Sequence, residues 1–142
     1  MIPLADANRL IEATLAKGAD LGLKPLTVAV LDPAASLVAF QRQASFGGAL
    51  ARPDIAIGKA RAVLALGIPA SRRAEETAAQ RPAFIQGVIA SYGGPFVAIT
   101  GALAIVRDGT LLGAVGVSGD TSDNDEKAAI AGLAAIGLKP AG

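Results

Sequence analysis

Apolar and polar residues follow two different periods along this chain, and the changes between them mark the predicted elements. Residues 4–21 place apolar side chains three and four positions apart, with the charged residues off that stripe, which predicts an amphipathic helix. Residues 26–31 and 36–42 are short runs rich in Val, Leu and Ala, and they predict two strands. The Asp-Pro-Ala-Ala sequence at 32–35 predicts a hairpin turn between them.

The middle of the chain is predicted to be helical. Residues 45–53 form a glycine-bearing loop, which leads into a helix from about Asp54 to Leu66. Residues 71–90 are more polar, and Pro82 is expected to break them into two short helices because proline cannot donate the interior helical hydrogen bond. A Tyr-Gly-Gly-Pro turn follows at 92–95.

A second hairpin and a last helix complete the pattern. Residues 96–100 and 102–106 are apolar runs of strand type, separated by Gly101. The Asp108-Gly109 pair is the strongest hairpin signal in the chain, and residues 111–117 form the returning strand. An alanine-rich helix is predicted over 122–136.

The order helix, hairpin, helices, hairpin, helix predicts an α/β (α+β) sandwich. Two separate hairpins do not build a doubly wound parallel sheet, so we expect about five mainly antiparallel strands with helices on both faces. Residues 1–142 contain no internal repeat or linker, which predicts a single domain.

The composition favours a self-associating protein. Apolar residues make up 52% of the chain and aromatic residues only 4%, so the core must consist of small aliphatic side chains. The mean hydropathy of +0.50 is high for a small soluble monomer. Since a chain of this length has a small interior, we expect a homo-oligomer that buries apolar surface between subunits.

Charge and patterning exclude several classes of partner. The net charge is +1 and no run of Lys or Arg is present, so the sequence gives no support for nucleic-acid binding. No apolar run reaches the roughly 20 residues that span a bilayer, so we expect no membrane partner. The first residues lack the basic and apolar regions of a signal peptide, which leads us to expect a cytoplasmic protein.

The chain contains neither cysteine nor histidine. This removes disulfides, thiol nucleophiles, Ser-His-Asp triads and histidine general bases. Proton transfer would have to use Asp, Glu, Lys, Tyr92 or water. The spacing of Asp123 and Asp125 is not that of an EF-hand loop, so we predict no metal site.

The stretch from Gly113 to Glu126 is the first place to look for a site. It predicts a buried strand that ends at Ser118 and turns at once into a helix start. Asp120 and Thr121 are typical N-capping residues. The alternative is that Asp120 contacts a ligand or acts as an acid or base, with Ser118 and Thr121 binding the same ligand.

Four further residues are candidates for binding or catalysis. Lys59 interrupts an otherwise apolar helix face. It is either a lysine whose stem packs on the core, or a partly buried amine. Such an amine would pair with Asp32 or another carboxylate, or receive a substrate carboxylate, and burial would lower its pKa and suit it as a base. Arg42 and Arg52 are then candidates to hold an anionic ligand.

Three blocks of the sequence resemble the haem-degrading, GlcG-like (HbpS-like) domain family. They are Val28–Asp32 with Leu37–Arg42, then Pro53–Ala60, then Gly113–Gly119 with Thr121 and Asp125-Glu126. The family includes GlcG proteins, extracellular haem-binding HbpS-type proteins and the C-terminal domain of some corrinoid adenosyltransferases. The resemblance implies a profilin-like α/β sandwich that assembles into homo-oligomers. It also implies haem binding in some members.

The chain departs from the family pattern at informative positions. The usual Ser-Gly-Gly-Thr corner is Ser118-Gly119-Asp120-Thr121 here, so Asp120 is an added carboxylate. With no histidine, haem would need Tyr92, Met1 or a lysine as its iron ligand, which disfavours haem as the cofactor.

Three functions remain open on the sequence. The first is a homo-oligomeric protein that binds a small organic acid, with Lys59, Arg42 and the Asp120 corner at its site. The second is a haem or tetrapyrrole binder. The third is a lyase, isomerase or hydrolase that uses Asp120 and Lys59 as an acid–base pair.

Overall fold

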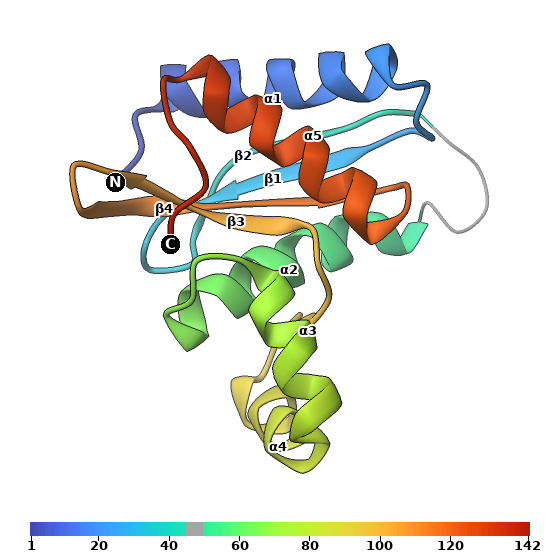
Figure 1. Cartoon of the computed structure of the whole chain (residues 1–142), viewed down its shortest axis with the longest axis vertical. Helices are drawn as coiled ribbons and strands as arrows, with labels where there is room; N and C mark the ends of the chain where they lie inside the picture. The colour runs from blue at the N-terminus through green and yellow to red at the C-terminus, as the bar shows by residue number, and fades with distance from the viewer. Residues whose placement is uncertain (45–49) are drawn as a thin grey trace.

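The computed structural model (Figure 1) describes residues 1–44 and 50–142, and the predicted loop at 45–53 lies partly outside them. Within the described residues the chain forms five helices and four strands. Their order is α1 (Leu4–Asp20), β1 (Thr27–Leu31), β2 (Leu37–Arg42), α2 (Arg52–Leu66), α3 (Ser71–Gln80), α4 (Pro82–Tyr92), β3 (Ala102–Arg107), β4 (Thr110–Ser118) and α5 (Ser122–Ala135). This confirms the α+β class.

The four strands of the described residues form one antiparallel sheet in the order β2-β1-β4-β3. The prediction of about five strands is therefore wrong by one. Residues 96–100, expected as a strand, leave the sheet and run along α2 instead, where Val97 N–H donates to the Gly58 carbonyl at 3.1 Å. Phe96 is buried between α2 and α3 against Ala62 and Ala74. This run therefore packs a side chain against helices and does not pair with a strand.

Both predicted hairpin turns are confirmed. Asp108 and Gly109 have φ angles of 50° and 76°, the positive values that a two-residue turn between twisted strands requires. In the first turn Ala35 takes a φ of 63°. The Asp32 side chain supports this conformation, because its Oδ1 accepts from Ala34 N–H at 2.9 Å and from Ser36 N–H at 3.0 Å.

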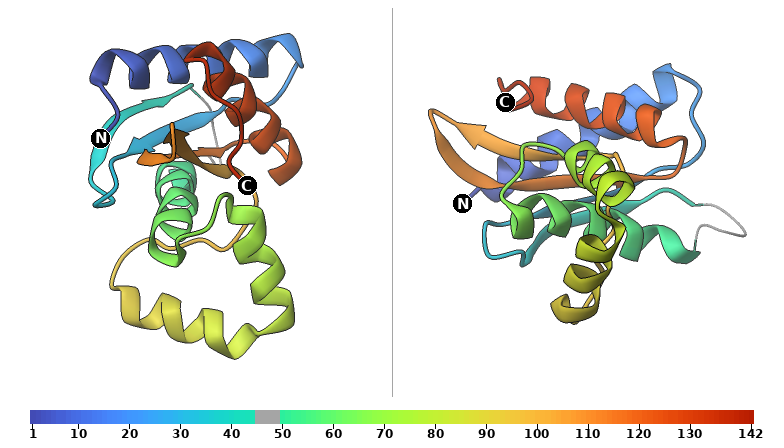
Figure 2. Two further views of the ribbon diagram at one scale, coloured as in Figure 1. Left: turned by 60° about the vertical axis from the view of Figure 1, so that its left-hand side comes forward. Right: turned by 60° about the horizontal axis from the view of Figure 1, so that its bottom comes forward.

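Helices cover both faces of the sheet, as predicted (Figure 2). One face carries α1 and α5, and the core there is built from aliphatic side chains of both helices and three strands, among them Leu10, Ile11, Val28, Val30, Val115 and Leu133. The other face carries α2, whose contact with the sheet uses smaller residues, among them Ala60, Val63, Ala102, Ala104 and Ala114. The second helix layer therefore lies close to the strands.

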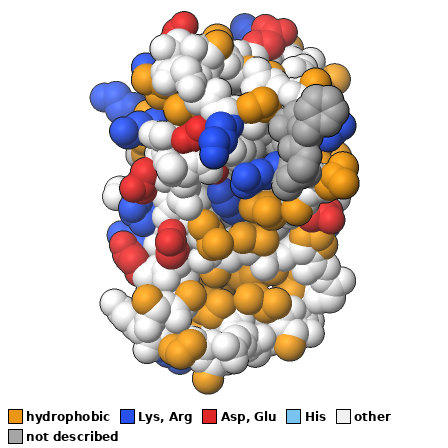
Figure 3. All heavy atoms as spheres, turned by 90° about the vertical axis from the view of Figure 1, so that its right-hand side faces the viewer, with side chains coloured by type: hydrophobic (Ala, Val, Ile, Leu, Met, Phe, Trp, Pro, Cys, Tyr) orange, Lys and Arg blue, Asp and Glu red, His pale blue; other side chains and the backbone are white. Residues whose placement is uncertain are grey.

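The helices α3 and α4 extend beyond α2, away from the sheet (Figure 1). The break at Pro82 is confirmed, since α3 ends at Gln80 and α4 begins at the proline. Only Ile85 of α4 is buried, whereas Phe84 and Ile89 are 42% and 41% exposed. Hydrophobic side chains accordingly gather on the half of the surface that holds these helices (Figure 3).

Among the described residues, none of the helices has the length and apolar character that crossing a bilayer requires.

Candidate functional site

The strand-to-helix corner between β4 and α5 is formed as the sequence predicts. Thr121 is the N-cap of α5, and its Oγ1 accepts from Asn124 N–H at 3.3 Å. Gly119 lies just before it with a φ of 157°, and a Cβ there would come within 2.3 Å of the Pro25 carbonyl oxygen. The corner therefore needs glycine at 119, because the chain leading into β1 passes directly beside it.

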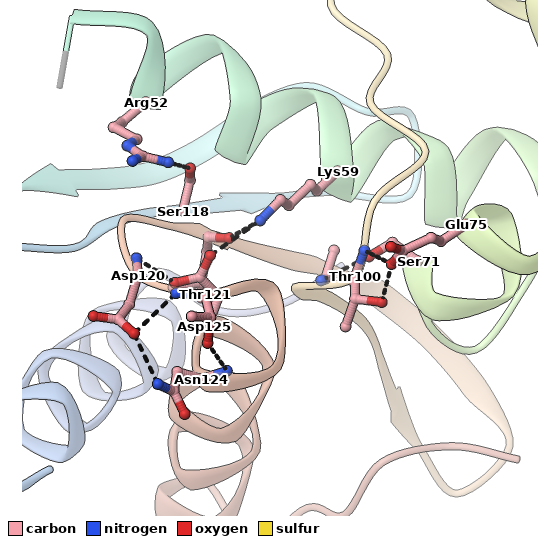
Figure 4. Close-up of polar contacts among 12 residues, drawn as sticks. Arg52, Lys59, Ser71, Glu75, Thr100, Ser118, Asp120, Thr121, Asn124 and Asp125 are labelled. Carbon is pink, nitrogen blue, oxygen red and sulfur yellow. Dashed lines mark hydrogen bonds and ion pairs between the residues drawn. The ribbon is translucent and has the colours of Figure 1, made fainter. Parts of the chain in front are cut away.

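Asp120 binds the backbone and side chains around this corner (Figure 4). Its Oδ1 accepts from Thr121 N–H at 2.9 Å and from the Asn124 side-chain amide at 2.7 Å, and its Oδ2 accepts from Lys24 N–H at 2.9 Å. The Asn124 side chain and the two backbone donors lower the Asp120 pKa to about 2. Asp120 is thus a fixed carboxylate that ties the corner to the α1–β1 connection.

This arrangement predicts an acid-dependent loss of stability. The folded-state pKa lies below the ordinary value of 3.8, so the contribution of Asp120 is present above about pH 4 and is lost as the pH falls towards 2. Urea unfolding of the wild type and of Asp120→Asn should therefore differ at pH 6 and converge near pH 2. The control is Asp20→Asn, an exposed position that should stay close to wild type at both values. A difference for Asp120→Asn that is the same at pH 6 and pH 2 would contradict the assignment.

Lys59 lies in the middle of α2 and is only 3% exposed, so its amine does not reach solvent. Its Nζ donates to the Val117 carbonyl at 2.9 Å and to Asp125 Oδ2 at 3.2 Å. Asp125 Oδ1 accepts in turn from Asp120 N–H at 2.9 Å. This chain of bonds joins α2, the end of β4 and the first turn of α5 (Figure 4).

The Lys59–Asp125 ion pair decides between the two alternatives for Lys59. Burial lowers the pKa of the Lys59 amine, and the carboxylate of Asp125 opposes this shift. Burial likewise raises the pKa of Asp125, and Lys59 opposes that. Lys59 is therefore a buried amine paired with a carboxylate, and of the expected partners this is another carboxylate, Asp125, and not Asp32. Asp32 binds the hairpin turn at the opposite end of β1.

The structure gives Lys59 and Asp120, the acid–base pair of the third hypothesis, separate hydrogen-bond partners. No hydrogen bond or ion pair joins their side chains in the described part of the chain, and each is bound to other partners. Among the described residues, Asp125 connects them, since it accepts from both Lys59 Nζ and Asp120 N–H. The sequence analysis considered Asp125 only for a metal site, which it did not predict, and not as the partner of Lys59. In residues 1–44 and 50–142 no acidic group has the arrangement of a metal site.

Arg42, Arg52 and Ser118 gather at one end of the sheet. Thr27, the first residue of β1, is paired with Arg42 on one side and with Ser118 on the other, so the three lie in one row and face the same side of the sheet. Arg52, the first residue of α2, donates from Nη1 to the Ser118 hydroxyl at 3.4 Å. Two strand spacings separate Arg42 from Ser118, about 10 Å between their Cα atoms.

Arg42 and Arg52 differ from Arg9, Lys59, Arg72 and Arg107, which form ion pairs with carboxylates. Arg52 is half-buried and Arg42 is exposed, and neither forms an ion pair with a carboxylate among the residues that the structure describes. Arg52 contacts the hydroxyl of Ser118, whereas an arginine with a purely structural role usually contacts a carboxylate. The row can therefore receive an anion, since a guanidinium offers several donors in one plane.

A separate polar pocket of about 380 Å³ lies between α3 and the start of α5, with Arg72, Glu75 and Thr100 in its wall. These groups are already paired. Arg72 binds Asp123 and Glu126, and these hydrogen bonds raise its pKa. Glu75 accepts from both the backbone and the hydroxyl of Thr100. No sequence motif indicated this network, because its members come from segments far apart in the chain.

Fold and sequence together place this chain in a known family. The sequence profile of the family described as "Haem degrading protein HbpS-like" matches residues 2–134, so the chain belongs to the HbpS-like family. This confirms the resemblance carried by the three sequence blocks. The curated proteins gave no match to the chain.

Solved structures agree on the fold. PduOC, solved as a haem complex, is 23% identical, with a TM-score of 0.85 and 99% of each chain covered. The protein ORFY of Klebsiella pneumoniae, assigned to the family DUF336, is 22% identical, with a TM-score of 0.83 over 96% of this chain and 91% of that one. A double mutant of HbpS from Streptomyces reticuli is 22% identical, with a TM-score of 0.80 over 96% and 88%. At these identities the likeness establishes the shared fold.

Proposed function

We propose that this protein binds a small organic acid, with the ligand carboxylate held by Arg52 and Arg42 beside the Ser118 hydroxyl. The observation that carries the proposal is Arg52, a half-buried guanidinium that contacts a hydroxyl at 3.4 Å and has no carboxylate partner in the described residues. Thr27 and Ser118 lie between the two arginines in the same row. A ligand carboxylate would give these guanidinium groups the charged partner that no described residue supplies.

The contacts of the β4–α5 corner, next to the arginine row, favour a binding role over a catalytic one. The buried Lys59–Asp125 pair fixes the end of β4 that carries Ser118, and Asp120 fixes the turn that follows. Neither group is free to exchange a proton with a ligand at the arginine row. Lys59 therefore acts as a support of the site in this proposal, and the acid–base role predicted for Lys59 and Asp120 is not needed.

The experiment is a thermal-shift screen of short mono- and dicarboxylates, with the matching amides as uncharged controls, followed by calorimetric titration of the best acid. Arg52→Gln should weaken binding at least about tenfold, because a hydrogen bond to a charged group is worth roughly 1.5–3 kcal/mol. Arg52→Lys should give an intermediate affinity, since it keeps the charge and loses the planar donors. The matched control is Arg73→Gln, an exposed arginine on α3.

Two results would overturn this assignment. One is an affinity of Arg52→Gln equal to that of the wild type. The other is binding of the amides as tight as that of the acids, because the proposal rests on the anionic charge of the ligand.

Self-association is the second part of the proposal. The apolar content of the chain and the exposed Phe84 and Ile89 of α4 support a homo-oligomer that covers part of this surface. No charged residue interrupts α4, which runs from Pro82 to Tyr92. Sedimentation equilibrium measures this directly, and a monomer mass at micromolar concentration would remove this part of the proposal.

Haem binding is the second candidate function, and the likeness to PduOC, solved as a haem complex, favours it. Of the possible iron ligands, Met1 is 77% exposed, and Tyr92 is half-buried with its ring centroid 5.4 Å from that of Phe96. A hemin titration that gives a saturable Soret shift would support this function. A titration with no saturable shift would exclude it and leave the organic-acid proposal untouched.

A further inference from the structure

A second pocket, of about 370 Å³, lies at the end of α2 opposite Arg52, and it is apolar. Its wall is formed by side chains from α2, from the segment after it, and from both strands of the β3–β4 hairpin, namely Val63, Leu64, Pro69, Ala104, Val106 and Leu111. The C-terminal residues Ala141 and Gly142 line it from the other side. Neither the sequence motifs nor the proposed organic-acid site involves these residues.

The pocket follows from a mismatch between the lengths of a helix and a hairpin. The helix α2 ends at Leu66, and Gly67 closes it in the left-handed conformation with a φ of 63°. The β3–β4 hairpin continues beyond that point, and Val106 pairs with Leu111 on the side of the sheet that α2 covers elsewhere. Ala104 has only a methyl group to fill the space, so the sheet face past the last helical turn is hollow.

Two backbone N–H groups beside the pocket donate within the chain. Ala104 N–H donates to the Pro69 carbonyl at 2.9 Å, and Ile68 N–H donates to the Val63 carbonyl at 3.1 Å. None of the described residues that line the pocket carries a charged or hydrogen-bonding side chain. A charged ligand would lose its hydration here without a polar side chain to replace it, whereas an apolar ligand would gain from leaving water.

The pocket is also a site distinct from the arginine row. The two lie at opposite ends of α2, which has 15 residues. At 1.5 Å per residue, this separates them by roughly 20 Å. Its volume is at the lower end of the roughly 300–1,000 Å³ of small-molecule sites, and Leu111, which is 41% exposed, stands at its mouth. A compact ligand therefore fits and can enter from solvent.

We propose that this pocket binds an uncharged apolar small molecule, of the size of one or two rings or a short alkyl chain. The ligand would lie on Ala104 and Val106, against the last turn of α2. This site acts independently of the organic-acid site, so the failure of either proposal leaves the other in place.

The test uses the uncharged fluorophore N-phenyl-1-naphthylamine with the full chain. We expect a saturable rise in fluorescence with one probe bound per chain. Leu111→Asp should weaken binding at least tenfold, because it places a charge at the mouth of the pocket. Val106→Phe should weaken it similarly by occupying the space without adding charge.

The matched control is Leu21→Asp, the same substitution at a leucine that is 44% exposed at the far end of α1. This variant should bind the probe as the wild type does, with circular dichroism confirming that every variant is folded. The proposal is overturned if the wild type shows no saturable binding, or if both pocket variants keep wild-type affinity, which would place the probe outside this pocket. Equal weakening in Leu21→Asp would overturn it as well.

Discussion

Lys59→Met should lower the free energy of unfolding by about 3–5 kcal/mol, the usual cost of leaving one member of a buried ion pair without its partner. Asp125 is 1% exposed, and its Oδ2 accepts from Lys59. In the variant this carboxylate would stay buried, and Asp120 N–H would be its one remaining donor among the described residues. Methionine fills most of the lysine volume, so the loss reports on charge and hydrogen bonding more than on packing. Urea unfolding at pH 7 measures it.

A second substitution separates the ion pair from the rest of the corner. Asp125→Asn in the Lys59→Met background removes the uncompensated charge, while an amide oxygen remains to accept from Asp120 N–H. We therefore expect the double variant to recover part of the loss. The control is Lys127→Met, an exposed lysine of α5, which should change stability by no more than about 0.5 kcal/mol. A loss in Lys59→Met as small as that of the control would show that the pair contributes nothing.

The elements could be predicted because their signals are local. Helical periodicity placed α1 and α5 to within a residue or two, and Asp108-Gly109 placed the second hairpin, since only a few residues adopt two positive φ angles in succession. The prediction of a fifth strand was wrong because the local signal there is ambiguous. Residues 96–100 are apolar and short, and periodicity alone does not separate a strand from a segment that packs against a helix.

The candidate site could be predicted only in its residue types. An isolated lysine on an apolar helix face indicated that Lys59 was unusual, and it is buried. Its partner was missed because Asp125 lies 66 residues further on, where sequence spacing carries no information about contact. Asp32 was the nearer choice along the chain, but an aspartate in a tight turn binds the turn's own N–H groups. The arginine row depends on strand register in the same way.

Gly116→Ala should destabilise the fold by several kcal/mol, more than the roughly 1–3 kcal/mol typical of an overpacked core. Gly116 lies on the β4 face that α2 covers, and an added Cβ would come within 2.0 Å of the Ala56 carbonyl oxygen and 3.1 Å of the Ala60 nitrogen. Both atoms belong to the helix backbone, which has no rotamer to change. The helix would have to move away from the sheet.

That movement reaches the proposed binding site, which makes the effect larger than a local clash. Lys59 lies on α2 between Ala56 and Ala60, the two residues that an added Cβ at Gly116 would contact. Its hydrogen bonds to Val117 and Asp125 depend on the same close approach of α2 to the sheet. Arg52 at the start of α2 depends on it for its contact with Ser118. Gly116→Ala should therefore weaken carboxylate binding as well as lower the urea midpoint.

The matched control is Gly87→Ala. Gly87 lies inside α4 with nothing within 4 Å of an added Cβ, so alanine replaces the weaker helix former at no steric cost. We expect it to raise stability by about 0.5–1 kcal/mol and to leave binding unchanged. The same methyl group should thus act in opposite directions at two glycines of one chain. Equal urea midpoints for the two variants would contradict the close contact of α2 with the sheet on which the arginine row depends.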